Sequence, residues 1–123
     1  MATLIPKLSL TSQNSLTDPL NLETTYRVDT IVDPKEFSKR TISTASTTTL
    51  MPTNSLYSYF YIKVLSGASK TNYITLTIGA AFTTKVRIKE FLFLPLDNTQ
   101  IVKAQSVLGN CKIEYGYWSR ESA

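Results

Sequence analysis

The chain of 123 residues is long enough for one hydrophobic core and too short for several domains. Hydrophobic residues make up 42% of it and aromatic residues 11%, which excludes a disordered polar chain. The formal net charge is +4 and the basic residues are scattered, so we expect the protein to bind neither nucleic acid nor a membrane surface.

The N-terminal segment predicts a strand from Thr3 to Leu10, with Leu4 and Leu8 in phase with Leu10. Pro6 has no amide hydrogen and therefore restricts this strand to a sheet edge or a bulge. The loop TSQNSLTDP follows, rich in residues that favour turns. These features predict an N-terminal arm or edge strand over residues 1–18 and a folded domain over residues 19–123.

Two further strands and a turn are predicted in the next part of the chain. Leu20 to Val32 alternates, with its apolar residues broadly on one side. The charged stretch VDPKEFSKR predicts a turn with at most one short helical turn, which Asp33 before Pro34 would cap. Thr41 to Leu50 is rich in hydroxyl groups and predicts an edge strand.

The segment LYSYFYIKV predicts a strand with rings on both faces. Tyr57, Tyr59 and Tyr61 would lie on one face. Phe60 and its in-phase neighbours would lie on the other, facing the core. Cross-strand packing of the tyrosines, a subunit interface and a sugar-binding platform all remain open as explanations.

The C-terminal half predicts more strands separated by short turns. Phe91 and Phe93 lie in FLFL, which is apolar on both faces and therefore unsuited to a solvent-facing strand of a monomer. Lys85, Arg87 and Lys89 would share a strand face, as a solvated surface or an anion contact. The remaining predicted strands are Tyr73–Ile78, Ala80–Lys89, Thr99–Ala104 and Cys111–Trp118. About eight strands at this spacing predict an all-β fold, a single antiparallel β-sandwich or jelly-roll-like domain with an extended N-terminal segment.

Several kinds of catalytic and metal site lack their residues. The chain has no histidine and one cysteine, Cys111, so Ser-His and Cys-His nucleophiles and zinc sites are excluded, as is an intrachain disulfide. Glu90 and Glu114 could in principle act as a glycosidase carboxylate pair, but their spacing is not diagnostic. We expect no enzymatic activity, no catalytic residues, no cofactor and no metal.

Four segments together resemble small accessory virion proteins of tailed bacteriophages: Tyr59–Lys63, Glu90–Leu96, Val102–Ala104 and Ile113–Trp118. In that family a YxYIKN strand is followed by a PGEFxFLPL strand entry, a VKAxA strand and a closing VEYGxW strand. Here Lys89 replaces the glycine before the glutamate and Val64 replaces the asparagine after the lysine, so the tight turn before Glu90 is in doubt.

The resemblance implies a non-enzymatic β-sandwich of the virion, either a capsid decoration (cement) protein or a neck, tail or fibre component. The first is favoured here, and carbohydrate binding belongs to the alternative. The start MATLIPKLSL lacks the features of a signal peptide, so we expect production in the host cytoplasm and assembly into the virion.

The expected partners are the major capsid protein and further copies of the chain, with a trimer favoured. Closed symmetry would cover the second apolar face that a monomer exposes. The predicted interface consists of aromatic residues: Tyr57, Tyr59, Tyr61, Phe91, Phe93 and Trp118. The predicted capsid-contacting arm presents apolar residues: Leu4, Ile5, Leu8 and Leu10.

Overall fold

The computed structural model describes residues 2–11, 21–26, 28–30, 36–51, 58–80, 82–96 and 100–119. Within these ranges all regular secondary structure is β-strand and none is helix, so the predicted all-β fold is confirmed. The strands are β1 (Ala2–Leu4), β2 (Lys7–Thr11), β3 (Asn21–Thr25), β4 (Val28–Thr30), β5 (Glu36–Ile42), β6 (Thr48–Met51), β7 (Ser58–Gly67), β8 (Tyr73–Ile78), β9 (Phe82–Arg87), β10 (Phe91–Leu96), β11 (Val102–Ser106) and β12 (Cys111–Ser119).

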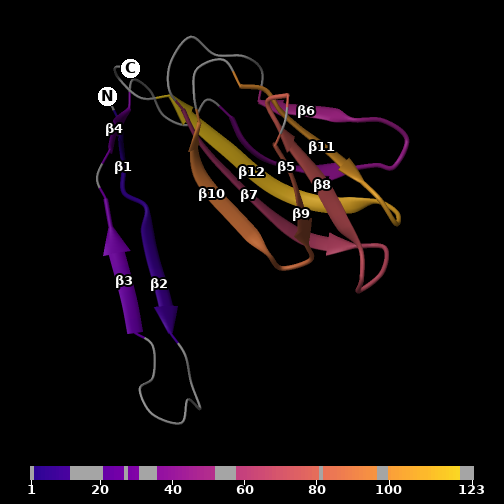
Figure 1. Cartoon of the computed structure of the whole chain (residues 1–123), viewed down its shortest axis with the longest axis horizontal. Helices are drawn as coiled ribbons and strands as arrows, with labels where there is room; N and C mark the ends of the chain where they lie inside the picture. The colour runs from indigo at the N-terminus through magenta and orange to yellow at the C-terminus, as the bar shows by residue number, and fades with distance from the viewer. Residues whose placement is uncertain are drawn as a thin grey trace.

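Eight of the strands form two four-stranded antiparallel sheets that pack face to face (Figure 1). The strand orders are β10-β7-β12-β5 and β6-β11-β8-β9. Four antiparallel pairs are nested along the chain: β8 with β9, β7 with β10, β6 with β11 and β5 with β12. One long hairpin rolled up on itself produces this nesting, which is the jelly-roll topology. The predicted jelly-roll-like sandwich is therefore confirmed.

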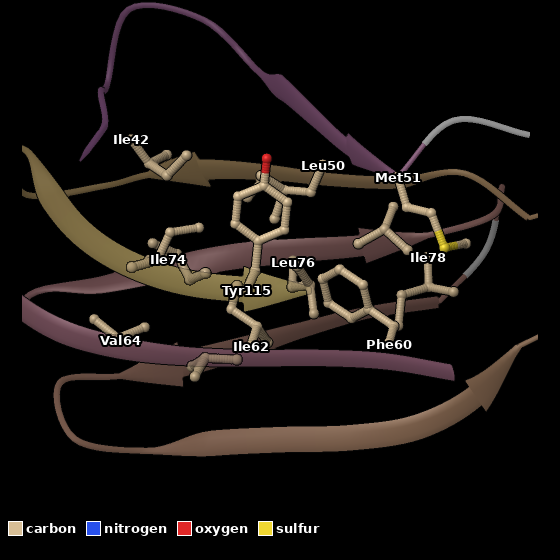
Figure 2. Close-up of a cluster of buried hydrophobic side chains, with 14 of the residues drawn as sticks. Ile42, Leu50, Met51, Phe60, Ile62, Val64, Ile74, Leu76, Ile78 and Tyr115 are labelled. Atoms are coloured by element: carbon tan, nitrogen blue, oxygen red, sulfur yellow. The ribbon is translucent and has the colours of Figure 1, made fainter. Parts of the chain in front are cut away.

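The core lies between the two sheets and consists of alternate residues of their strands. Its largest fully buried side chains are Tyr115, Phe60, Ile42, Leu50, Met51, Ile62, Ile74, Leu76, Ile113, Val64 and Val102. Figure 2 shows Tyr115 of β12 pointing into the space between the sheets, among aliphatic side chains. Full burial of one such aliphatic or phenylalanine side chain contributes about 1.5–3 kcal/mol. Cys111 belongs to the same core as a buried thiol.

The other four strands form two antiparallel pairs, joined end to end into one ribbon that stands apart from the sandwich (Figure 1). In the ribbon β1 pairs with β4 and β2 with β3, and the Tyr26 amide donates a 3.2 Å hydrogen bond to the Pro6 carbonyl between the two pairs. Pro6 interrupts the predicted Thr3–Leu10 strand because it cannot donate to a ladder. The ribbon includes Asn21–Thr25 and Val28–Thr30, so it extends beyond the arm predicted over residues 1–18.

Two predicted elements between the ribbon and the aromatic strand are wrong. Glu36–Arg40, predicted as part of a turn, belongs to the strand Glu36–Ile42, because its backbone pairs with β12 at a sheet edge where charged side chains reach water. The strand predicted over Thr41–Leu50 is broken, because the chain leaves one sheet after Ile42 and enters the other at Thr48.

The turn between β9 and β10 forms although a lysine replaces the glycine of the phage pattern. Lys89 has a backbone φ of 74°, in the left-handed region that favours glycine. The Lys89 amide donates to the Val64 carbonyl at 2.8 Å, and the Glu90 carboxylate accepts from the Arg87 amide at 2.8 Å. The predicted shared face is therefore wrong for Lys89, which lies in the turn, while Lys85 and Arg87 lie in β9.

Candidate interface

Aromatic side chains from three strands meet on the outer face of the sheet β10-β7-β12-β5. We call Tyr59, Tyr61, Phe91, Phe93 and Trp118 the aromatic face. Cross-strand register places Tyr61 opposite Phe93 and Trp118 opposite Tyr59. Side chains alternate along a strand, so these rings lie on the side away from the buried Phe60 and Ile62. Exposure is uneven: Tyr59 is 8% exposed and Phe91 is 61% exposed.

Two rings of the aromatic face pack on each other. The centroids of Tyr59 and Phe93 are 5.7 Å apart and their planes differ by 12°, an offset-stacked pair between β7 and β10. Such a pair contributes about 0.5–1.5 kcal/mol beyond the area that it buries. Cross-strand packing of the tyrosines is therefore confirmed for Tyr59, whereas the exposed Phe91 remains available to a partner.

A polar pair stands beside the rings. The Tyr61 hydroxyl donates a 3.1 Å hydrogen bond to Oε2 of Glu114 on the neighbouring strand β12. Burial raises the pKa of Tyr61 above its ordinary value of 10.0, and the hydrogen bond to Glu114 and the negative charge of Glu114 raise it further. Lys63 and Lys39 lie opposite Glu114 on the two flanking strands. This row of the face therefore carries two cations and one anion.

The ribbon exposes apolar side chains on both of its strands. Ile5, Leu8 and Leu10 are 57%, 39% and 42% exposed. Leu22 and Tyr26, which the alternation of Leu20–Val32 placed broadly on one side, are 46% and 60% exposed. They are exposed because β3 pairs with β2 in the ribbon rather than entering the sandwich.

A groove of about 720 Å³ lies between the ribbon and the aromatic face. One wall comes from the middle of the ribbon: Pro6, Lys7, Leu8, Thr24, Thr25 and Tyr26. The other wall comes from the sandwich: Tyr61, Phe91, Leu92, Phe93, Glu114 and Trp118. A mostly apolar groove with a few polar groups is the ordinary form of a binding site.

The structure thus brings together most of the residues that the sequence predicted for the interface and the capsid-contacting arm. Tyr61, Phe91, Phe93, Trp118 and Leu8 line one groove, and Tyr59 lies beside it. Ile5 and Leu10 are exposed on the ribbon outside the groove lining. Tyr57 and the side chain of Leu4 lie outside the described residues.

Sequence reasoning missed Tyr26, Lys7 and Glu114 as groove residues. Glu114 could have been found from its place between Ile113 and Tyr115 on an alternating strand, which directs it to the same face as Trp118. The ribbon residues carry no comparable signal, because their position depends on how the ribbon stands beside the sheet.

The outer face of the second sheet has a different chemistry. Lys85 and Arg87 lie over the ring of Tyr73, with the charged groups 5.0 Å and 5.6 Å from its centroid. Strands β6, β8, β9 and β11 contain no acidic residue. Both cations therefore make cation–π contacts with Tyr73 on a strand face that is open to solvent.

The two candidate carboxylates lie in different surroundings. Glu114 accepts a hydrogen bond from Tyr61, while Glu90 accepts one from the Arg87 amide in the β9–β10 turn and lines a separate depression. Among the described residues no three His, Cys, Asp or Glu side chains gather as metal ligands would. That part of the chain also contains no helix of a length and apolarity suited to a bilayer.

Comparison of the chain with models of protein families, with curated proteins and with solved structures finds no match.

Proposed function

We propose that the protein is a non-enzymatic structural component of a bacteriophage virion, a decoration protein that binds the outer capsid shell and stabilises it. The observation that carries this proposal is the ribbon, which stands apart from a complete sandwich and exposes Ile5, Leu8, Leu10 and Leu22. A sandwich with its own core does not need these side chains for folding. Apolar residues gathered on a projecting element favour a protein partner.

The jelly-roll topology supports the proposal at the level of the fold, because viral capsid proteins commonly use it. Fold alone does not determine function, so the proposal depends mainly on the exposed side chains of the ribbon and the aromatic face. The resemblance of the β7, β10, β11 and β12 segments to phage accessory proteins points the same way.

The mechanism would be mechanical rather than chemical. The ribbon would contact the major capsid protein, and the aromatic face would contact further copies of the chain, as in the favoured trimer. Linked contacts of modest strength then act together, since each bound contact raises the effective concentration of the next. A net charge of +4 without a cationic run does not favour nucleic acid as the partner.

The test is binding of ribbon variants to capsid shells from which the protein has been removed. Leu8→Ser and Leu10→Ser remove apolar area from the ribbon, and each should weaken binding about tenfold. Phe82→Ser is the matched control, because Phe82 is 55% exposed on β9 of the opposite sheet. Melting curves should be unchanged for all three variants. Full-strength binding by both ribbon variants would contradict the role of the ribbon.

A carbohydrate-binding component of the neck, tail or fibre is the second candidate. Tyr61, Trp118 and Glu114 in one groove favour it, because sugars stack on rings and donate to carboxylates. Trp118 is the only tryptophan, so its fluorescence reports on this groove alone. A saturable fluorescence change with a panel of host glycans, abolished by Glu114→Ala, would favour this candidate over capsid binding.

A further inference from the structure

The outer face of the sheet β6-β11-β8-β9 gathers cations that lie apart in the sequence. Ile74 and Leu76 of β8 are buried, so the residues that alternate with them point to the outer face. Strand register then places Lys85 and Arg87 of β9 on one side of β8 and Lys103 of β11 on the other. We call Lys85, Arg87 and Lys103 the cationic face.

No carboxylate of the sheet neutralises the cationic face. Strands β6, β8, β9 and β11 contain no acidic residue, and the one ion pair found among the described residues lies on the ribbon. Glu90 follows β9 in the chain, but its carboxylate accepts a hydrogen bond from the Arg87 backbone amide. Lys85 and Arg87 instead lie over the ring of Tyr73, at 5.0 Å and 5.6 Å from its centroid. Such a face repels its own copy and favours an anionic partner.

The neutral side chains of the same face are hydrogen-bond donors. Thr75 and Thr77 of β8 and Thr83 of β9 point outward in phase with the cations. Gln105 also points outward, but its amide group already bonds to the connection between β5 and β6. Lysine, arginine and threonine are residues that contact phosphate oxygens in protein complexes. A face of cations and hydroxyl groups therefore suits a chain of phosphates.

The same face lacks an open ring on which a base or a sugar could stack. Tyr73 is the one aromatic residue at an outward position of these four strands, and Lys85 and Arg87 lie over its ring. Phe82 of β9 lies opposite the buried Ile78 and therefore belongs to the other phase. Bases and sugars bind proteins largely by stacking on aromatic rings. This feature favours a phosphate polymer without bases over a nucleic acid.

We propose that the cationic face binds a flexible phosphate polymer that carries no bases. Lys85, Arg87 and Lys103 each neutralise one phosphate, and Thr75 and Thr83 donate to phosphate oxygens. The cationic face and the aromatic face lie on opposite sides of the sandwich, so contacts of the aromatic face leave the cationic face uncovered. The source of the polymer is the surface of the host cell, a step that rests on the proposed function.

Titration with long-chain inorganic polyphosphate tests the role of the charges. We expect log K to fall with log salt at a slope of about −2, since each of three neutralised phosphates contributes about −0.7. Lys85→Ala, Arg87→Ala and Lys103→Ala should each weaken binding several-fold and make the slope shallower by about 0.7. Lys39→Ala is the matched control, because Lys39 is exposed on β5 of the other sheet. Equal losses in the control, or no binding at low salt, would overturn the proposal.

Removal of single hydroxyl groups tests the hydrogen bonds. Thr75→Val and Thr83→Val keep the branched shape and the charge of the strand. Each should weaken polyphosphate binding about two-fold or more and leave the salt slope unchanged, because the slope reports charges only. Thr41→Val is the control, at an exposed position of β5. Melting curves should be the same for all three variants. Full-strength binding by both Thr75→Val and Thr83→Val would contradict the assigned hydrogen bonds.

Two other polymers of matched length exclude or identify other partners. Single-stranded DNA that binds more tightly than polyphosphate would show contacts to bases, and poly-glutamate that binds as tightly would indicate an acidic protein surface. Either result would overturn the proposal.

Shell binding separates this proposal from the proposed function. Leu8→Ser and Leu10→Ser should bind polyphosphate at full strength. If polyphosphate does not bind while these variants lose shell binding, the cationic face is wrong and the decoration role stands. If polyphosphate binds and shells never bind the protein, the phosphate contact stands, while the decoration role and the host-cell source are wrong.

Discussion

The hydroxyl of Tyr61 donates a hydrogen bond of 3.1 Å to Oε2 of Glu114, across the adjacent strands β7 and β12. This bond exists only while Tyr61 is neutral. Both residues line the groove of the aromatic face, so this bond lies within the candidate interface.

The first prediction concerns this pair at high pH. Because the pKa of Tyr61 is raised above 10.0, its contribution to stability is complete below pH 10 and is lost as the pH rises through the higher pKa of the folded state. Glu114→Gln should lower the pKa of Tyr61, since it removes a negative charge. The measurement is ultraviolet titration of phenolate, with Tyr61→Phe subtracted to isolate this residue. An unchanged difference titration in Glu114→Gln would contradict the assignment.

The second prediction concerns Asn72, a fully buried polar side chain that joins two turns. Its amide nitrogen donates to the carbonyls of Gly109 and Asn110 at 3.0 Å and 3.4 Å. Its oxygen accepts from the amides of Tyr73 and Leu108 at 2.9 Å and 3.0 Å. Asn72→Ala leaves these backbone groups without that partner and should lower the free energy of unfolding by about 2–4 kcal/mol.

Urea denaturation measures this loss. Asn110→Ala is the matched control, because the Asn110 side chain is exposed and only its carbonyl takes part in the bond. That control should change the stability by less than about 0.5 kcal/mol. Similar losses in the two variants would show that the Asn72 side chain does not hold the turns together.

The third prediction is a stabilising change at Lys89. A lysine at a φ of 74° is strained, whereas glycine adopts this conformation without a side-chain clash. Lys89→Gly should therefore raise the free energy of unfolding by about 0.5–1 kcal/mol, although glycine also gives the unfolded chain more freedom. Lys103→Gly, at an exposed position within β11, should lower it by about as much. Thermal melting compares the two, and a loss of stability in both would be evidence against a strained turn.

The fourth prediction concerns the close approach of Gly109 to Ala68. A Cβ atom on Gly109 would lie 2.7 Å from the Cβ of Ala68, and the backbone φ of 132° is itself unfavourable for alanine. Gly109→Ala should cost about 3 kcal/mol or more. Adding Ala68→Gly removes the clash but not the backbone strain, so it should restore part of the loss.

Gly79→Ala separates the two effects, because Gly79 has a φ of 67° but its nearest neighbouring atom would be 3.4 Å away. It should cost about 1–2 kcal/mol from the backbone alone. A double-mutant cycle on Gly109 and Ala68 measures the steric part directly. No coupling between these two positions would refute the close contact.

Local alternation identified the strands that build the core. In β7, β8 and β12 every second residue is apolar, and the sets around Ile62, Ile74 and Ile113 face the core and are buried. A strand places successive side chains on opposite faces, so period two alone determines which residues face the core. The same rule predicted that Tyr59 and Tyr61 share the outer face.

The errors arose where backbone pairing overrides side-chain preference. Glu36–Arg40 follows Asp33-Pro34 and was predicted as part of a turn, but it forms a strand because its backbone pairs with β12 at the sheet edge. Lys89 occupies a conformation that its side chain disfavours, held by its hydrogen bond to Val64. Neither outcome can be read from neighbouring residues, because the partner strands lie far away in the chain.

By itself, then, the sequence determined an all-β chain, its inward-facing residues and a set of aromatic side chains on one outer face. Only the tertiary structure decided that Glu114 stands beside Tyr61, 53 residues away in the chain. It also decided that the strands containing Leu10 and Leu22 pair in a ribbon outside the sandwich. The physical reason is that alternation acts within one strand, whereas pairing depends on which backbone groups meet after the chain has rolled up.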